Sequence, residues 1–222
     1  MKKIAPIKVS AEIDKREYIQ IPGHDALISM FEPEEFKGYN WDEMHIKAGE
    51  KRLQMAPPSL FIPSLVNVIK AHNRKSVLYD GLGNPLSEER AEEVYTHLIS
   101  GAWSYLDAKY KFDKKAGIWH IQTDHQIIKE KDERIFTFRE SPLRKCLMEP
   151  CFVNLRFNSQ GLPTERSEYQ EYKQGENIHF YPPRDDSVAW FVADSDGAYL
   201  NCYRYASNSS PALGVYVVAR KI

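Results

Sequence analysis

Apolar residues recur at helical spacing in two segments of the first half of the chain. Between Pro57 and Asn73 they fall on one side of a 3.6-residue turn, which predicts a helix that is bent at Pro63 or begins there. A second helix is predicted from the N-cap residue Ser87 to about Lys109, with two glutamates in its first turn to complement the helix dipole. The stripe that this helix would bury consists of Ala91, Val94, Tyr95, Leu98, Ala102, Tyr105 and Leu106.

After Gly117 the pattern changes to short runs rich in β-branched and aromatic residues, separated by charged turns. The predicted strands are 118–121, 127–128, 135–138, 151–157, 178–181 and the closing segment 213–218. Helices followed by many short strands are typical of an α+β domain. We therefore predict that two N-terminal helices pack on an irregular, mostly antiparallel sheet.

A length of 222 residues suits a single domain with one well-buried core. Residues 1–55 are expected to form an N-terminal arm and the first elements, 56–110 the helices, and 117–222 the sheet. Within the arm, short apolar runs such as 18–21 are interrupted by proline and glycine, which is typical of an arm or an edge strand.

Composition narrows the classes of function. With 42% hydrophobic and 27% charged residues, the chain falls in the globular range, so a folded protein is expected. Thirty basic residues against 31 acidic ones leave a net charge of -1, which removes the general electrostatic argument for a nucleic-acid partner or an anionic membrane. No stretch has the length of a membrane span or the apolar core of a secretory signal. We therefore expect no membrane insertion and a cytoplasmic or virion-associated protein.

Between 188 and 218 the composition shifts toward Tyr, Asn, Ser, Ala and Gly. Strand alternation divides the run from 199 to 205 into two sides. One side carries the apolar residues and an arginine, namely Leu200, Cys202 and Arg204, and the other side carries Tyr199, Asn201, Tyr203 and Tyr205. Tyrosine combines a large contact area with a polar tip at low entropic cost, which is why binding surfaces favour it. The plainer interpretation is a sheet surface stabilised by cross-strand aromatic pairs.

A few positions near the C-terminus have a spacing that is typical of a family signature, and we call them the anchors. They are Gly197, Arg204, Pro211, 213–215 and Arg220. They resemble the C-terminal signature of the C-type-lectin-type fold of formylglycine-generating-enzyme-like domains, and 157–163 and 180–183 resemble the approach to it. The usual final Gly-Phe-Arg is Gly-Val-Tyr here, so its arginine contact is not carried over. The cluster of Tyr, Asn, Ser and Ala between these anchors is similar to one branch, the variable proteins of diversity-generating retroelements.

This resemblance implies a C-type lectin fold and a ligand-binding protein for receptor recognition, with a hypervariable C-terminal surface at 188–218 that a retroelement diversifies. It implies a viral, archaeal or bacterial accessory protein that is not an enzyme and that binds a protein or other macromolecular ligand. The candidate ligand-binding positions are Trp190, Val192, Asp194, Tyr199, Asn201, Tyr203, Tyr205, Asn208, Ser209 and Ser210. The alternatives are a structural or assembly protein with an ordinary aromatic sheet face and, third, an oxidase of the formylglycine-generating type.

Other candidate chemistry is weaker. His120, Asp124 and His125 bring two imidazoles and a carboxylate together in sequence, but a strand would point the two histidines to opposite faces, so no metal site is predicted. Segment 194–197 begins like a calcium loop and lacks the later ligands of an EF-hand. Formylglycine-generating enzymes use a cysteine pair close to their C-terminus, where only Cys202 lies here. The three cysteines are expected as small buried hydrophobes, with no catalytic residue and no cofactor.

Sequencing sibling copies of the gene tests the resemblance directly. We expect their substitutions to concentrate between 188 and 218, because a retroelement of this kind rewrites only the C-terminal region. Substitutions spread evenly over 1–183 would contradict it.

Overall fold

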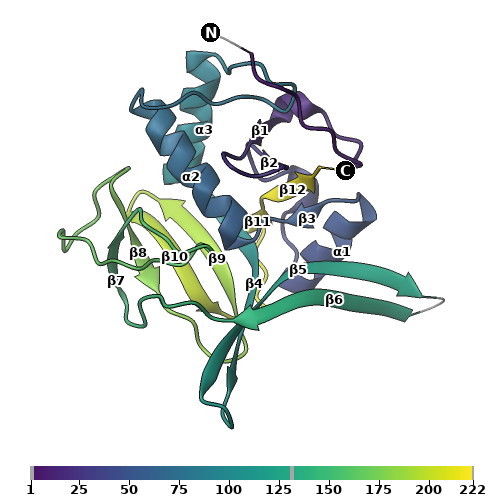
Figure 1. The fold of residues 1–222 in the computed structure, drawn as a ribbon, viewed down its shortest axis with the longest axis vertical. Helices are drawn as coiled ribbons and strands as arrows, with labels where there is room; N and C mark the ends of the chain where they lie inside the picture. The colour runs from purple at the N-terminus through teal and green to yellow at the C-terminus, as the bar shows by residue number, and fades with distance from the viewer. Residues whose placement is uncertain (1–2, 131–132, 222) are drawn as a thin grey trace.

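The first strands of the chain pair with its last strand in one small sheet. The strands are β1 (Tyr18–Gln20), β2 (Ala26–Ser29), β3 (Gln54–Met55) and β12 (Val217–Arg220). In the computed structural model, which describes residues 3–130 and 133–221, their order is β1-β2-β12-β3 and every pair is antiparallel (Figure 1). Strand β1 lies at an edge, as predicted for its apolar run.

A larger, eight-stranded sheet holds most of the remaining strands. They are β4 (Trp103–Asp113), β5 (Ile118–Glu130), β6 (Glu133–Pro142), β7 (Cys151–Asn154), β8 (Asn177–Tyr181), β9 (Ser187–Asp194), β10 (Gly197–Arg204) and β11 (Gly214–Val215). Their order is β6-β5-β4-β9-β10-β8-β7, and β11 pairs with β4. Only the β10–β8 and β11–β4 pairs among the described strands are parallel, so the predicted α+β class with a mostly antiparallel sheet is confirmed. The β5–β6 hairpin projects from the body of the molecule (Figure 1).

Two of the helices begin where the sequence predicts. Helix α2 (Pro58–His72) runs through Pro63 and is flanked by the caps Pro57 and Asn73. Helix α3 (Glu88–Ser100) starts at its predicted cap, because the Ser87 side chain accepts a hydrogen bond from the Arg90 backbone N–H. Within the described residues, no helix is both long and apolar enough to cross a membrane.

A third helix, α1 (Trp41–Glu50), lies in the segment predicted as the N-terminal arm and first elements. The prediction of two N-terminal helices therefore missed one. Its start is fixed by a capping box in which Asn40 and Glu43 each accept a backbone hydrogen bond from the other. Two short 3-10 turns, η1 (Lys15–Glu17) and η2 (Glu34–Phe36), complete this part of the chain.

The second predicted helix was too long. Helix α3 ends at Ser100, with Gly101 as its C-cap, and does not continue to Lys109. The apolar residues expected on its last turns, Tyr105 and Leu106, lie in β4. Residues 104–108 are all buried, so this strand has no apolar–polar alternation to distinguish it from a helix.

The closing segment 213–218 is also not one central strand. It divides at Tyr216 into β11 in the large sheet and β12 in the small sheet. The Tyr216 ring is buried against Phe61 of α2, with ring centroids 5.2 Å apart. The break lets the last strand leave one sheet and join the other.

The buried side chains form two groups. The larger lies between α2, α3 and one face of the large sheet, where Phe61 packs on Phe191 of β9 with ring centroids 4.9 Å apart. The smaller joins α1 to the small sheet and to β4, with Trp41, Met44 and Tyr105 at its centre. Strand β4 contributes to both groups.

A buried carboxylate links these parts. Glu32 follows β2, and its side chain accepts hydrogen bonds from the Trp103 backbone N–H at 3.1 Å and the Ser104 hydroxyl, while its other oxygen pairs with His97 of α3. Burial alone would raise the pKa of Glu32, but the hydrogen bonds from His97 and Ser104 and the charge of His97 outweigh it, so this pKa lies below its ordinary value.

We expect Glu32→Gln to lower the free energy of unfolding at pH 7 by about 2 kcal/mol, because the bonds to a charged acceptor are lost. A lowered folded-state pKa stabilises the fold above the ordinary value of 4.5, and this contribution is lost as the pH falls below it. The difference between variant and wild type should therefore shrink in urea denaturation series from pH 7 toward pH 3.

Glu34→Gln is the control, since Glu34 is exposed and its carboxylate pairs with the exposed end of Lys37. It should change the unfolding free energy by less than about 0.5 kcal/mol. A Glu32→Gln difference that stays constant with pH would contradict the assigned role of the charge.

Candidate functional site

The large sheet has one buried and one half-exposed face between β7 and β4. On the buried face, Phe180, Leu200 and Phe191 stand side by side beneath the helices. The other face carries half-buried rings on adjacent strands, and we call it the aromatic face. Its members are Trp103, Phe152, His179, Tyr181, Trp190, Tyr199 and Tyr203.

The rings of the aromatic face contact one another across the strands. His179 stacks on Phe152 with centroids 4.7 Å apart and lies 6.0 Å from Tyr199. Tyr181 meets Tyr203 edge to face at 5.3 Å. Such pairs add about 0.5–1.5 kcal/mol beyond the area that they bury. The cross-strand aromatic pairs of the plainer sequence interpretation are therefore present, and the rings remain half-exposed.

A β-bulge changes the predicted sides of β10. The pairing of β10 with β9 shifts register between Asn201 and Arg204, and the Asn201 side chain accepts a hydrogen bond from the Tyr203 N–H at 3.0 Å. The extra residue turns Arg204 onto the aromatic face, where its guanidinium lies 3.7 Å from the Trp190 ring centroid. The prediction that Arg204 shares a side with Leu200 was therefore wrong.

The candidate positions fall into distinct environments. Trp190, Tyr199 and Tyr203 belong to the aromatic face, whereas Val192 and Asn201 lie on the same side but are only 6% and 7% exposed. These two are packed within the sheet and present little surface to a partner.

The remaining candidates lie at the two ends of the β9–β10 hairpin. Asp194 is the last residue of β9 at one end, where its carboxylate accepts a hydrogen bond from the Asp196 N–H. At the other end Tyr205 is 70% exposed and begins the loop that contains Asn208, Ser209 and Ser210. The structure thus gathers the loop and the nearby rings but separates them from Asp194.

Buried groups of β4 and α1 hold the backbone of the loop 205–210 by hydrogen bonds. The Tyr105 hydroxyl lies 3.0 Å from the Tyr205 carbonyl oxygen and 2.9 Å from that of Asn208. The Trp41 backbone N–H donates to the Ala206 carbonyl at 3.0 Å. The backbone of 205–208 is therefore anchored, while the Tyr205 side chain points away from the core.

The three cysteines are free thiols. Cys202 is buried as predicted; burial raises its pKa to about 12, and the Tyr110 hydroxyl contacts its sulfur at 3.2 Å. Cys146 and Cys151 are only partly buried, although burial still raises the pKa of Cys146 to about 11. Burial also raises the pKa of Cys151, and a raised pKa disfavours the nucleophilic thiolate form at all three positions.

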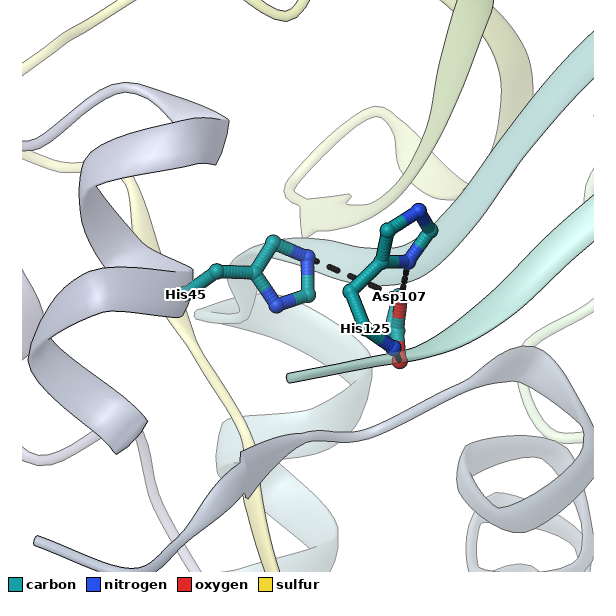
Figure 2. Close-up of side chains that lie close together, drawn as sticks. All are labelled: His45, Asp107 and His125. Carbon is teal, nitrogen blue, oxygen red and sulfur yellow. Dashed lines mark hydrogen bonds and ion pairs between the residues drawn. The ribbon is translucent and has the colours of Figure 1, made fainter. Parts of the chain in front are cut away.

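A buried group of three polar side chains lies between α1 and the strands β4 and β5. His45 of α1, Asp107 of β4 and His125 of β5 converge there (Figure 2). His125 Nδ1 lies 2.5 Å and His45 Nε2 3.6 Å from Asp107 Oδ1. Burial lowers the pKa of His45 and raises that of Asp107, the latter against hydrogen bonds from His125.

The prediction that His120 and His125 point to opposite faces was wrong, because a β-bulge lies between them in β5. His120 pairs with Glu140, and Asp124 pairs with Arg139, whereas His125 points inward. Asp124 has a positive φ of 56°, and the pairing of β5 with β6 shifts by one residue between Thr123 and Gln126. The extra residue places the His125 ring 5.4 Å from that of Phe138, on the side of the sheet that His120 and Glu140 share. Of the sequence trio, only His125 joins the buried group.

Sequence reasoning missed His45 and Asp107. The Asn40 and Glu43 capping box was a local signal for α1, and within that helix His45 shares a face with Trp41. No local pattern in the sequence indicates that His45 would lie beside Asp107.

Comparison of the chain with known protein families, curated proteins and solved structures gives no significant match. Function is therefore inferred from the residues and their geometry.

Alanine substitutions should distinguish a ring that stabilises the fold, Trp190, from an exposed ring that does not, Tyr205. We expect Trp190→Ala to lower the free energy of unfolding by about 2 kcal/mol, because it removes a half-buried ring and its contact with Arg204. Tyr205→Ala should change it by less than about 0.5 kcal/mol. Urea denaturation measures both, and a loss above about 1 kcal/mol for Tyr205→Ala would place that ring in a packed interface.

Proposed function

We propose that this chain is a recognition protein that binds another protein, or a comparable macromolecular ligand, on the aromatic face and the adjoining loop 205–210. The observation that carries the proposal is a contiguous set of half-exposed rings on a sheet whose other face is packed under helices. Tyrosine and tryptophan dominate the energetic centres of protein interfaces, and a rigid sheet holds them at little entropic cost on binding.

Two arginines add directional contacts to this surface. Arg184 lies 4.5 Å from the Tyr203 ring centroid, and Arg204 covers Trp190. The buried Nε of Arg204 has no hydrogen-bond partner among the described residues. Guanidinium groups held over aromatic rings are well placed to donate to carboxylates or carbonyl groups of a partner.

We further propose that the fold is of the C-type lectin type and that a diversity-generating retroelement varies the displayed positions. Four of the predicted anchors support this, because Gly197, Leu213, Gly214 and Val215 are buried whereas Tyr205 and Ser209 are exposed. The anchors Pro211 and Arg220 are themselves exposed. A Cβ on Gly214 would lie 2.8 Å from the Glu32 Cβ, and Gly197 has a φ of +146° with Tyr172 close by. Leu213 is buried. Under this proposal Val192 and Asn201 act as supports, and the exposed positions vary.

The alternative of a structural or assembly protein rests on the same surface. The cross-strand ring contacts suit an ordinary aromatic sheet face as well as a binding surface. The two functions differ in whether the exposed rings are replaceable.

Two matched libraries of the full chain, displayed on phage, distinguish them. In the first library, Tyr199, Tyr203, Tyr205 and Ser209 are randomised. In the second, the buried anchors Gly197, Leu213, Gly214 and Val215 are randomised. We expect most members of the first library and few of the second to resist protease, because the anchors are fully buried whereas the first set is half-buried or exposed. Selection of the first library on unrelated proteins should then yield specific binders.

Equal protease sensitivity of the two libraries would favour the structural alternative. A folded first library that yields no binder on any target would contradict the recognition function itself.

A further inference from the structure

The buried group formed by His45, Asp107 and His125 has the composition of a metal site. Two imidazole nitrogens and a carboxylate oxygen, one from each of three elements, lie within 4.8 Å of one another (Figure 2). Their side chains are 1%, 0% and 5% exposed. Two histidines and one carboxylate are a ligand set that zinc and other divalent transition metals favour.

One atom of the group is not accounted for by the protein. His45 Nε2 is buried, points toward Asp107 and has no hydrogen-bond partner among the described residues. A buried polar atom left without a partner costs about 1–3 kcal/mol. The hydrogen bond between His125 and Asp107 satisfies those two side chains but leaves this nitrogen unexplained.

The distances suit a shared ion. Ligand atoms that are each about 2.1 Å from a tetrahedral metal lie about 3.4 Å apart. The separation of 3.6 Å between His45 Nε2 and Asp107 Oδ1 is close to this value. The pair His125 Nδ1 and Asp107 Oδ1, at 2.5 Å, would exchange its hydrogen bond for two metal–ligand bonds and move apart.

Neighbouring groups hold the ligands in place, as the outer shell of a metal site does. The second oxygen of Asp107 accepts a hydrogen bond from the His125 backbone N–H at 3.1 Å. Trp41 packs edge-on against both imidazoles, with centroids 4.2 Å from His45 and 4.8 Å from His125. The indole is itself fixed by a hydrogen bond from Nε1 to the Leu106 carbonyl.

A cavity of about 300 Å³ gives access to the group, since His45 and His125 both line it. Arg220 and Lys221 also line it, and their charges are offset by Asp124 and Asp25. An ion can therefore reach the two histidines from this side, and a coordination position not taken by protein would face the cavity.

We propose that His45, Asp107 and His125 bind one divalent transition metal ion of the zinc class. The proposal does not depend on the recognition function, because none of the three residues belongs to the aromatic face or to the loop 205–210.

The test is titration of the chelator-treated full chain with Co²⁺, followed by visible absorption, and with Zn²⁺, followed by calorimetry. We expect one equivalent of either ion to bind, and Zn²⁺ to raise the melting temperature by several degrees. The Co²⁺ complex should lack the near-ultraviolet band of thiolate ligands, which excludes Cys146 and Cys151 as the site. His45→Gln and Asp107→Asn should each weaken binding at least 100-fold, because loss of a ligand should cost more than the roughly 10- to 100-fold that loss of an outer-shell partner costs.

His24→Gln is the matched control, because it removes an exposed histidine and should leave binding unchanged. Circular dichroism of each variant establishes that it is folded, and the Co²⁺ spectrum of the wild type stands even if one variant is not. Absence of stoichiometric binding by the wild type, a thiolate spectrum, or folded His45→Gln and Asp107→Asn variants that bind as tightly as His24→Gln would overturn the proposal.

Discussion

Burial of strand β4 on both faces is the constraint on which the other features depend. The strand pairs with β5, β9 and β11, and residues 104–108 are all buried. Polar groups on such a strand must find partners inside the protein. Ser104 finds the Glu32 carboxylate, Tyr105 the carbonyls of the C-terminal loop, and Asp107 the buried histidines. One strand thus ties the small sheet, the loop and the histidine group to a single framework.

The two proposed sites use this framework in different ways. The aromatic face spans the sheet from β4 to β7, and its rings are half-exposed. The histidine group lies where α1 covers β4 and β5, so its side chains are removed from water. Exposure suits recognition by large, rigid side chains, whereas enclosure suits a ligand set that must be held in one geometry.

Prediction succeeded where the signal was local. The Ser87 cap and the apolar period of α2 are set within a few residues, and both helices begin where expected. It failed where neighbours in space override the pattern. Strand β4 is buried on both faces, so its continuous apolar run was predicted as a continuation of the preceding helix. The bulge after Asn201 places Arg204 on the other face from the predicted one. Helix α1 had a capping signal at Asn40, but its apolar stripe is too weak to stand out in sequence.

The sequence by itself determined the class of the fold, the two longest helices and the aromatic character of the C-terminal strand, because these follow from periodicity, caps and composition within short windows. Only the tertiary structure decided which rings remain exposed and which polar groups meet. His45, Asp107 and His125 are far apart along the chain, and their approach requires α1 to pack on the paired strands β4 and β5. Contacts of that kind are set by the packing of whole elements, which no local pattern records.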